Sequence, residues 1–129
     1  MDTQKQIINT SEAPKAIGPY SQAVKVDKLL FISGQIPVDH KTGSLVSGGI
    51  EAQTKRVMEN IKAILTASGA TTDNIVKTTI YLKNIDDYKF VNLVYEKYFE
   101  KDFPARSTVA VSDLPKKVDV EIDAIAILE

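Results

Sequence analysis

Two charged side chains in the last quarter of the chain are the residues best suited to chemistry. Arg106 is one of only two arginines, against fourteen lysines, in a chain of 129 residues. It stands in an apolar stretch, and Glu121 stands in another one, between Val120 and Ile122. A guanidinium grips a carboxylate through two parallel hydrogen bonds, which an ammonium does less well. An arginine at the rim of a buried sheet therefore predicts a bound organic anion.

Glu121 could act together with that arginine. If the last two strands pair as a hairpin across residues 113–117, Glu121 lies opposite residues 107–109 and close to Arg106. A guanidinium and a carboxylate at the opening of one cleft would anchor an organic acid and orient a water molecule. The alternative is structural: Arg106 forms a surface or interface salt bridge, and Glu121 is one of several acids on its strand. Strand alternation alone does not separate the two interpretations.

Four further residues are weaker candidates for the same site. Tyr20 lies in GPYSQAV, after a Gly-Pro turn. Ser33 and Gly34 interrupt the strand pattern FISGQIP, and a glycine inside a strand marks either a bulge or a close approach to a ligand. Asn92 lies on a helix. The alternative for Tyr20 is a partly buried aromatic ring, and for Asn92 a solvated polar position.

Composition argues against several classes of site. The chain has no cysteine, which excludes disulfides, thiol nucleophiles and cysteine-bearing zinc sites. Its single histidine, His40, belongs to a predicted turn, so we expect His40 at the surface and predict no metal site. The net charge is −1 with no basic cluster, which argues against nucleic acid as a partner. No apolar run suits a membrane or a secretion signal, so we expect a soluble cytoplasmic protein.

The hydrophobic pattern predicts one α/β domain over residues 1–129. The chain order is ββ(β)αβαββ, and each helix has a single apolar stripe, so both helices should cover the same face of the sheet. The predicted strands span residues 6–8, 23–26, 29–38, 76–83, 106–111 and 118–128, and the predicted helices span residues 50–68 and 86–99. Several strands are apolar on both faces. Because a large apolar patch is not left in water, we predict a homo-oligomer with packed sheet faces.

Five segments resemble, in order and spacing, the RidA (YjgF) family of reactive-intermediate deaminases. They are GPYSQAV, FISGQIPVD, QTKRVMENIKAIL, VYEKYF and PARSTVAVSDLPKKVDVEI, and together they cover essentially the whole chain. The resemblance implies a chorismate-mutase-like (YjgF-type) fold, a mixed α+β sheet with two helices on one face. It also implies a homotrimer with a central barrel-like sheet core and ligand clefts at the subunit interfaces.

The resemblance further implies a reaction, the hydrolysis of 2-imino acids to 2-keto acids and ammonia without a cofactor. The imines, such as 2-iminopropanoate and 2-iminobutanoate, arise from enamines (2-aminoacrylate among them) released by pyridoxal-phosphate-dependent dehydratases. By this analogy Arg106 holds the substrate carboxylate, and Glu121 positions the attacking water with the main-chain carbonyl of Thr108. The residues implied to border the ligand are Tyr20, Ser33, Gly34 and Asn92.

One departure from the family is Thr108, where many members carry cysteine. A main-chain carbonyl is available from either residue, so only thiol-based regulation is affected. The main alternative function is a non-catalytic sensor or partner protein that binds keto acids or amino acids in the same cleft. Chorismate mutase would need more cationic groups than two arginines provide. Ribonuclease activity fits poorly with one histidine and no basic groove.

Overall fold

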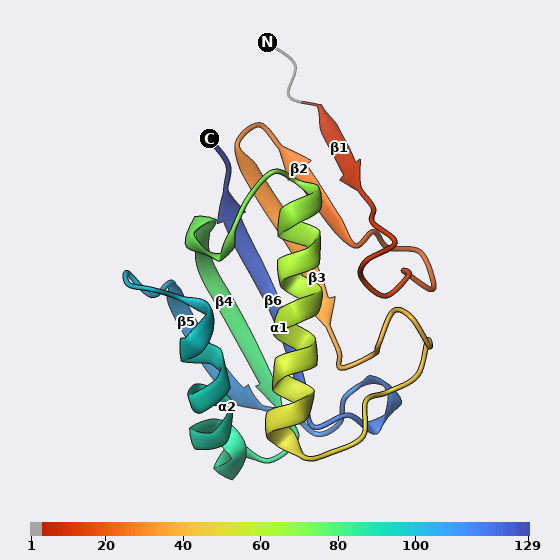
Figure 1. Cartoon of the computed structure of the whole chain (residues 1–129), viewed down its shortest axis with the longest axis vertical. Coiled ribbons are helices and arrows are strands. Elements are labelled where there is room, and N and C mark those ends of the chain that lie inside the picture. Colours follow the sequence, from red (N-terminus) through yellow and green to blue (C-terminus); the bar gives the residue numbers. More distant parts are fainter. Residues whose placement is uncertain (1–3) are drawn as a thin grey trace.

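The computed structural model describes residues 4–129, which form one mixed β-sheet backed by two helices (Figure 1). The strands are β1 (Lys5–Ile8), β2 (Ala23–Val26), β3 (Leu29–Gln35), β4 (Ile75–Leu82), β5 (Ala105–Ala110) and β6 (Val120–Ile127). The helices are α1 (Ile50–Ala67) and α2 (Tyr88–Tyr95), and 3-10 turns cover Thr72–Asn74, Ile85–Asp87, Glu96–Tyr98 and Pro115–Lys117. The predicted fold class is confirmed. No helix within this range combines the length and apolar character needed to cross a membrane.

The strand order corrects the predicted pairing of the last two strands. The order in the sheet is β1-β2-β3-β6-β4-β5, so β4 lies between β5 and β6. β5 pairs with β4 in parallel, and every other pairing is antiparallel. A parallel partner needs a long crossover, which α2 supplies between β4 and β5. The predicted hairpin across residues 113–117 is therefore wrong, and the argument that placed Glu121 beside Arg106 fails with it.

The core lies between the sheet and the two helices. Alternate residues of β6 (Val120, Ile122, Ala124 and Ala126) are buried against them. The apolar stripe of α1 is buried as predicted, and its fully buried members are Val57, Met58, Ile61, Ile64 and Leu65. The helix ends at Ala67 with Ser68 as its C-cap, and Gly69 follows with a positive φ of 76°, a conformation that glycine favours. The second helix is shorter than predicted, because residues 85–87 and 96–98 form 3-10 turns at its two ends.

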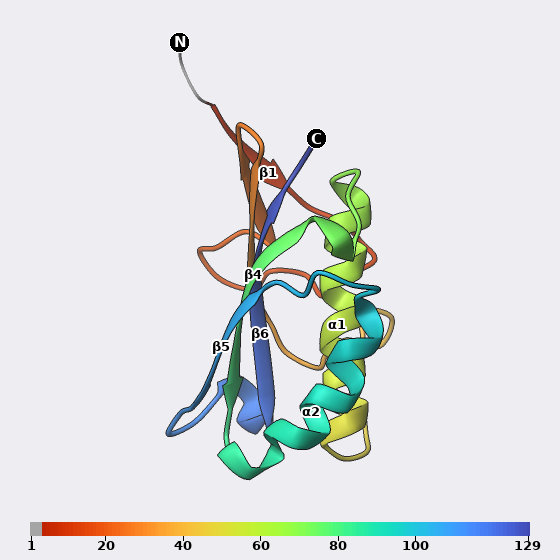
Figure 2. The same ribbon diagram turned by 90° about the vertical axis from the view of Figure 1, so that its left-hand side faces the viewer.

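The other face of the sheet is largely bare (Figure 2). Large apolar side chains are exposed on it, among them Leu29, Phe31, Val109 and Ile127, each 40–47% exposed. The side view shows both helices on one side of the sheet. The prediction of strands that are apolar on both faces is confirmed for β3 and β6.

Two local features fix the loops that surround the sheet. β2 and β3 form the predicted hairpin, and Asp27 takes the left-handed conformation that its turn requires, with φ 56°. The segment after β3 is tied to α1 by Asn60, which is fully buried. Its side-chain amide donates to the carbonyls of Ile36 and Val38 at 3.1 and 3.0 Å. These bonds hold the segment that forms one wall of the site described next.

Candidate functional site

Glu121 lies directly over Gly34. Gly34 sits where the β3–β6 register shifts, between Ile32 and Gln35, so the strand bends at this point. A methyl group at Gly34 would lie 2.0 Å from Glu121 Oε2 and 2.8 Å from its Cδ. With the carboxylate in this position, only a glycine leaves room for it at residue 34. Of the two predicted meanings of this strand glycine, the structure shows the bulge, and the group that approaches the backbone is the Glu121 side chain. Close approach to a ligand stays a prediction.

The Glu121 carboxylate is half-buried and lacks a hydrogen-bond partner among residues 4–129. Burial raises its pKa, and the nearby charge of Asp123 raises the pKa further. Asp123 in turn accepts a hydrogen bond of 3.1 Å from the Tyr81 hydroxyl. A buried acid whose pKa is raised without a structural partner is typical of a functional site, because a structural acid is usually paired.

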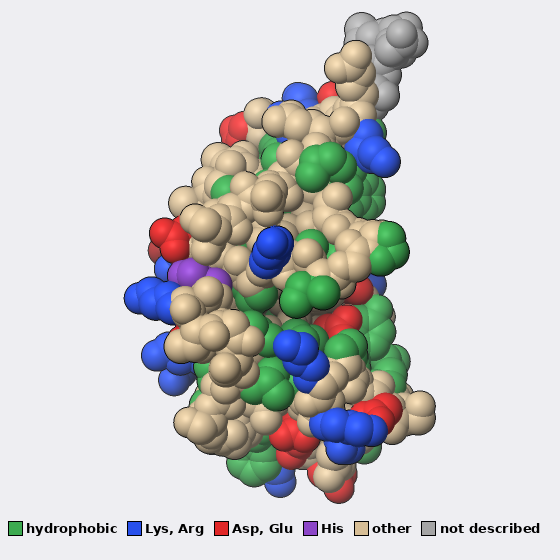
Figure 3. All heavy atoms as spheres, turned by 90° about the vertical axis from the view of Figure 1, so that its right-hand side faces the viewer, with side chains coloured by type: hydrophobic (Ala, Val, Ile, Leu, Met, Phe, Trp, Pro, Cys, Tyr) green, Lys and Arg blue, Asp and Glu red, His purple; other side chains and the backbone are tan. Residues whose placement is uncertain are grey.

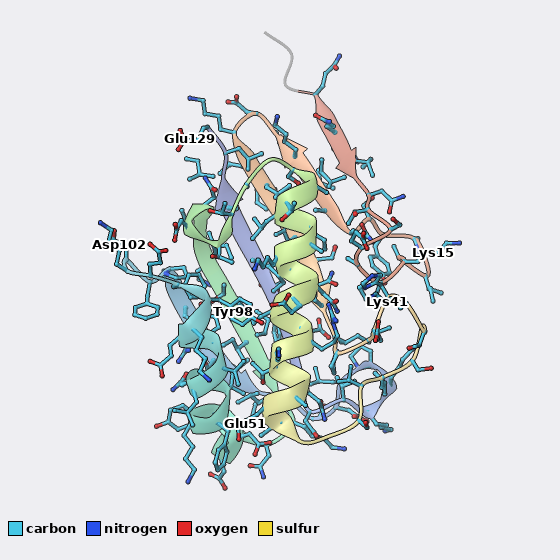
Figure 4. The ribbon with its side chains drawn as sticks, viewed as in Figure 1. Lys15, Lys41, Glu51, Tyr98, Asp102 and Glu129 are labelled. Atoms are coloured by element: carbon cyan, nitrogen blue, oxygen red, sulfur yellow. The ribbon has the colours of Figure 1, made fainter. Side chains whose placement is uncertain are left out.

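Glu121 and Gly34 line a hollow of about 750 Å³, which also takes in Tyr20 and Ser33. Tyr20 is 54% exposed, and Ser33 Oγ donates to the Ser21 carbonyl at 2.6 Å. The loops around the hollow include the segment of Lys15, which Figure 4 places on the β2–β3 side of the molecule. Figure 3 looks onto this side, where hydrophobic, basic and acidic side chains intermingle. Four of the predicted site residues thus lie together.

Arg106 and Asn92 lie at a different hollow, of about 320 Å³. Arg106 Nη1 donates to Asn92 Oδ1 at 2.7 Å, and the guanidinium carbon stands 5.2 Å from the ring centre of Tyr95. The arginine is exposed on the edge strand β5, and the residues that hold it belong to α2. Figure 4 places the loop that leads into β5, at Asp102, on the side of the molecule away from Lys15.

Arg106 and Glu121 project from opposite faces of the sheet. Arg106 pairs with Thr78, which is fully buried and contacts Tyr95 of α2, so Arg106 shares the helix-covered face. Glu121 alternates with the buried Val120 and Ile122 and therefore points to the bare face. Within one chain the two side chains cannot contact the same small ligand.

Two other residues from the sequence analysis, Thr108 and His40, have side chains that are largely shielded from solvent. Thr108 lies on β5, beside Ile80, and its Oγ1 is buried without a partner among residues 4–129. His40 is in a turn as predicted, but the expectation that it lies at the surface is wrong. Its side chain is 15% exposed, its Nε2 lies 3.1 Å from Glu12 Oε2, and it lines the larger hollow. The neighbouring loops fold over it, which a local turn pattern does not reveal.

Sequence reasoning missed Tyr95, Tyr81 and Lys116. No motif marked the contact of Tyr95 with Arg106 or the hydrogen bond from Tyr81 to Asp123. Lys116 lines the larger hollow from a turn in which Lys116 and Lys117 both have positive φ, 55° and 59°. Such a pair of non-glycine residues is strained. The only sequence feature that indicates this turn is the proline that precedes it.

Comparisons with known proteins agree over almost the whole chain. Residues 10–128 match the family model described as Endoribonuclease L-PSP. The human 2-iminobutanoate/2-iminopropanoate deaminase is 48% identical over 95% of this chain and 90% of its own length. The crystal structure of YyfA from Yersinia pestis, titled as a Rid family protein, is 52% identical, with a TM-score of 0.95 over 97% of this chain and all of that one. E. coli TdcF, crystallised with bound serine, is 40% identical, with a TM-score of 0.92 over 96% and 99% of the two chains.

We expect Gly34→Ala to displace the Glu121 carboxylate, because the added methyl group would overlap Oε2. The movable side chain should yield before the backbone does. Stability should fall by at most about 1–3 kcal/mol. The pKa of Glu121 should drop toward its ordinary value as the group becomes hydrated, which a carboxyl NMR titration would measure. Gly49→Ala is the matched control, since a methyl group there meets nothing within 4 Å. An unchanged Glu121 titration in Gly34→Ala would contradict the assigned contact.

Proposed function

This chain belongs to the RidA (YjgF) family, and from that premise we propose that it hydrolyses 2-imino acids to 2-keto acids and ammonia. The observation that carries the proposal is Glu121, a half-buried carboxylate with a raised pKa and no structural partner among the described residues, at the wall of a ligand-sized hollow. The human relative's name gives the same chemistry. The family-model name does not lead us to propose RNA cleavage, since the chain has one histidine and a net charge of −1.

The proposed site is shared between two copies of the chain. One copy supplies Arg106 with Asn92, and the next supplies Glu121 with Tyr20, Ser33 and Gly34. The support is geometric, because Arg106 and Glu121 lie on opposite faces of one sheet. A contact between two different surfaces of identical chains builds a ring when the rotation from copy to copy closes. From the family resemblance we propose that this ring is a homotrimer. Packing in the trimer would cover the exposed Phe31 and Ile127.

In the proposed complex the substrate carboxylate binds Arg106. The guanidinium has five N–H donors, and one is engaged by Asn92. The others are available for a bidentate contact with a carboxylate. Fixing this end of the substrate holds the imine carbon near Glu121. This orientation raises the rate at which water attacks the carbon. The imine carbon is already electrophilic, so the residues present need only place and deprotonate a water.

Glu121 moves the protons in the proposed reaction. It accepts a proton from the water as the water oxygen bonds to the imine carbon, while the Thr108 carbonyl on edge strand β5 holds the other water hydrogen. Attack on the protonated imine gives a tetrahedral adduct with a hydroxyl and an amino group, and Glu121 returns its proton to the amino nitrogen. As the C–N bond breaks and ammonia leaves, the hydroxyl proton passes to the Glu121 carboxylate and the C–O bond becomes the keto group; that proton then leaves with the ammonia as ammonium. The raised pKa of Glu121 suits the attack step, because it makes the carboxylate a stronger base than an ordinary glutamate.

We expect Arg106→Ala to lower imine hydrolysis by at least about 10-fold to 100-fold, the value of a lost set of charged hydrogen bonds. The assay adds the protein to a serine or threonine dehydratase reaction and follows the decay of the imine absorbance. Lys89→Ala is the control, since Lys89 is an exposed cation on α2 that lies over the Phe90 ring and lines neither hollow. Unchanged hydrolysis in Arg106→Ala, with the assembly intact, would end the proposed role of this residue.

Mixing two inactive variants tests the shared site. In random assemblies of Arg106→Ala and Glu121→Gln chains, about one site in four receives both intact residues across a head-to-tail interface. We therefore expect co-expressed variants to recover about a quarter of wild-type turnover. A mixture of either variant with the double variant is the control and should remain inactive. Failure to recover turnover in verified mixed assemblies would show that two copies do not share the site.

A second candidate is a sensor that binds keto acids or amino acids without turnover. The bound serine in the TdcF crystal structure favours it, because serine is an amino acid rather than an imine. The two candidates diverge at Glu121. For an enzyme, Glu121→Gln should abolish hydrolysis while 2-oxobutanoate binding, measured by calorimetry, stays within about threefold, since the anion contact is retained. Wild-type protein that binds 2-oxobutanoate but does not speed imine decay over buffer would establish the sensor.

A further inference from the structure

We propose that Tyr95 is a positioning residue that holds the Arg106 guanidinium ready for a carboxylate without neutralising its charge. The proposal rests on the proposed function, in which Arg106 binds the substrate anion. It concerns a side chain whose described contact is with the arginine and not with the substrate carboxylate. Tyr95 is 4% exposed and acts, in this account, only through the arginine that stands over its ring.

The Tyr95 ring is itself fixed on two sides. Its hydroxyl lies 2.7 Å from Oγ1 of Thr78, a fully buried residue in the middle of β4. On another side the ring packs against Phe99, with 4.9 Å between ring centres and an angle of 46° between the planes. A buried hydroxyl that is hydrogen-bonded and a ring that is packed leave the tyrosine one orientation. Its ring is therefore a rigid surface next to the edge strand.

Two residues on one face of α2 restrain the Arg106 guanidinium, one from below its plane and one at its edge. Tyr95 lies below the guanidinium, 5.2 Å from ring centre to Cζ. Asn92, three residues earlier and so on the same helix face, accepts from Nη1 at 2.7 Å. An arginine that is exposed on an edge strand would otherwise sample many rotamers. Fixing it before the ligand arrives removes an ordering cost from binding.

Neither of these neighbours carries a charge. Among residues 4–129 the ion pairs join His40 to Glu12 and Lys117 to Asp113, and none involves Arg106. A carboxylate partner would hold the arginine equally well, but it would compete with the substrate for the guanidinium. The negative face of an aromatic ring attracts a cation without taking its hydrogen-bond donors. Glu96 lines the same hollow but forms no salt bridge with Arg106 among residues 4–129. The arginine thus keeps free N–H groups for an incoming anion.

The test separates the ring of Tyr95 from its hydroxyl. The Tyr95→Phe variant keeps the ring and loses the bond to Thr78, so stability should fall while the Kd for 2-oxobutanoate stays within about twofold. The Tyr95→Leu variant loses the ring, so the Kd should rise about 3-fold to 30-fold. In turnover, the KM should rise by the same factor with kcat nearly unchanged, because the carboxylate contact is made in the ground state and the transition state alike.

A fluorinated phenylalanine at position 95 keeps the proposal testable if Tyr95→Leu fails to fold. Fluorination preserves the shape of the ring and weakens its negative face, so the Kd should rise relative to Tyr95→Phe at equal stability. Tyr98→Leu is the matched control. Tyr98 packs beside α1 (Figure 4), where its hydroxyl donates to Glu59 at 2.6 Å. Among residues 4–129 the hydrogen-bond and cation–π partners of Arg106 are Asn92 and Tyr95, not Tyr98. This control should lose stability and keep its affinity.

The outcomes distinguish this inference from the function on which it rests. If Arg106→Ala abolishes 2-oxobutanoate binding but fluorination and Tyr95→Leu leave the Kd unchanged, the positioning role is wrong and the function stands. If Arg106→Ala binds as the wild type does, the anion site itself is wrong. A rise in Kd that follows the loss of the ring's negative face, with stability held constant, supports the positioning role.

Discussion

The alternation of side chains along a strand is the constraint on which the rest of this structure depends. Arg106 shares its face with the buried Thr78, and Glu121 alternates with the buried Val120 and Ile122. Successive residues of a strand point to opposite faces, so these two assignments cannot be altered by a change of rotamer. A single chain therefore prepares two separate halves of a site. The same alternation leaves an apolar sheet face exposed, and covering that face with a second copy is the step that would bring the two halves together.

The two halves are prepared by different physical means. Glu121 is held by contact with the backbone of Gly34 and has no compensating partner among the described residues, so burial shifts its proton affinity upward. Arg106 is held by uncharged neighbours, an amide and an aromatic ring, so its charge is not compensated either. An ordinary structural ion pair would have satisfied both groups at lower energetic cost. Keeping both uncompensated is consistent with a site that reserves them for a ligand and a water.

Prediction from the sequence succeeded where the signal is local. The stripe of α1, the turn at Asp27 and the glycine that follows α1 each depend on residues within one or two turns of each other. It failed where distant segments compete for the same position. The last two strands are adjacent in sequence and were expected to pair, but α2 returns the chain to the outer side of β4 and leaves β6 in the middle of the sheet. His40 was misplaced for a related reason, because loops remote in sequence bury it.

The sequence by itself determined which residues are able to do chemistry, because side-chain type and local pattern are properties of the chain. It singled out a rare arginine and a carboxylate in apolar strands, and it marked Gly34 as a bulge or a close approach within a strand. Only the tertiary structure decided how these residues are distributed. Strand order depends on the competition among all possible pairings, and the face of each side chain depends on which neighbours the helices cover. That competition put the guanidinium on Tyr95 and the carboxylate on Gly34, on opposite sides of one sheet.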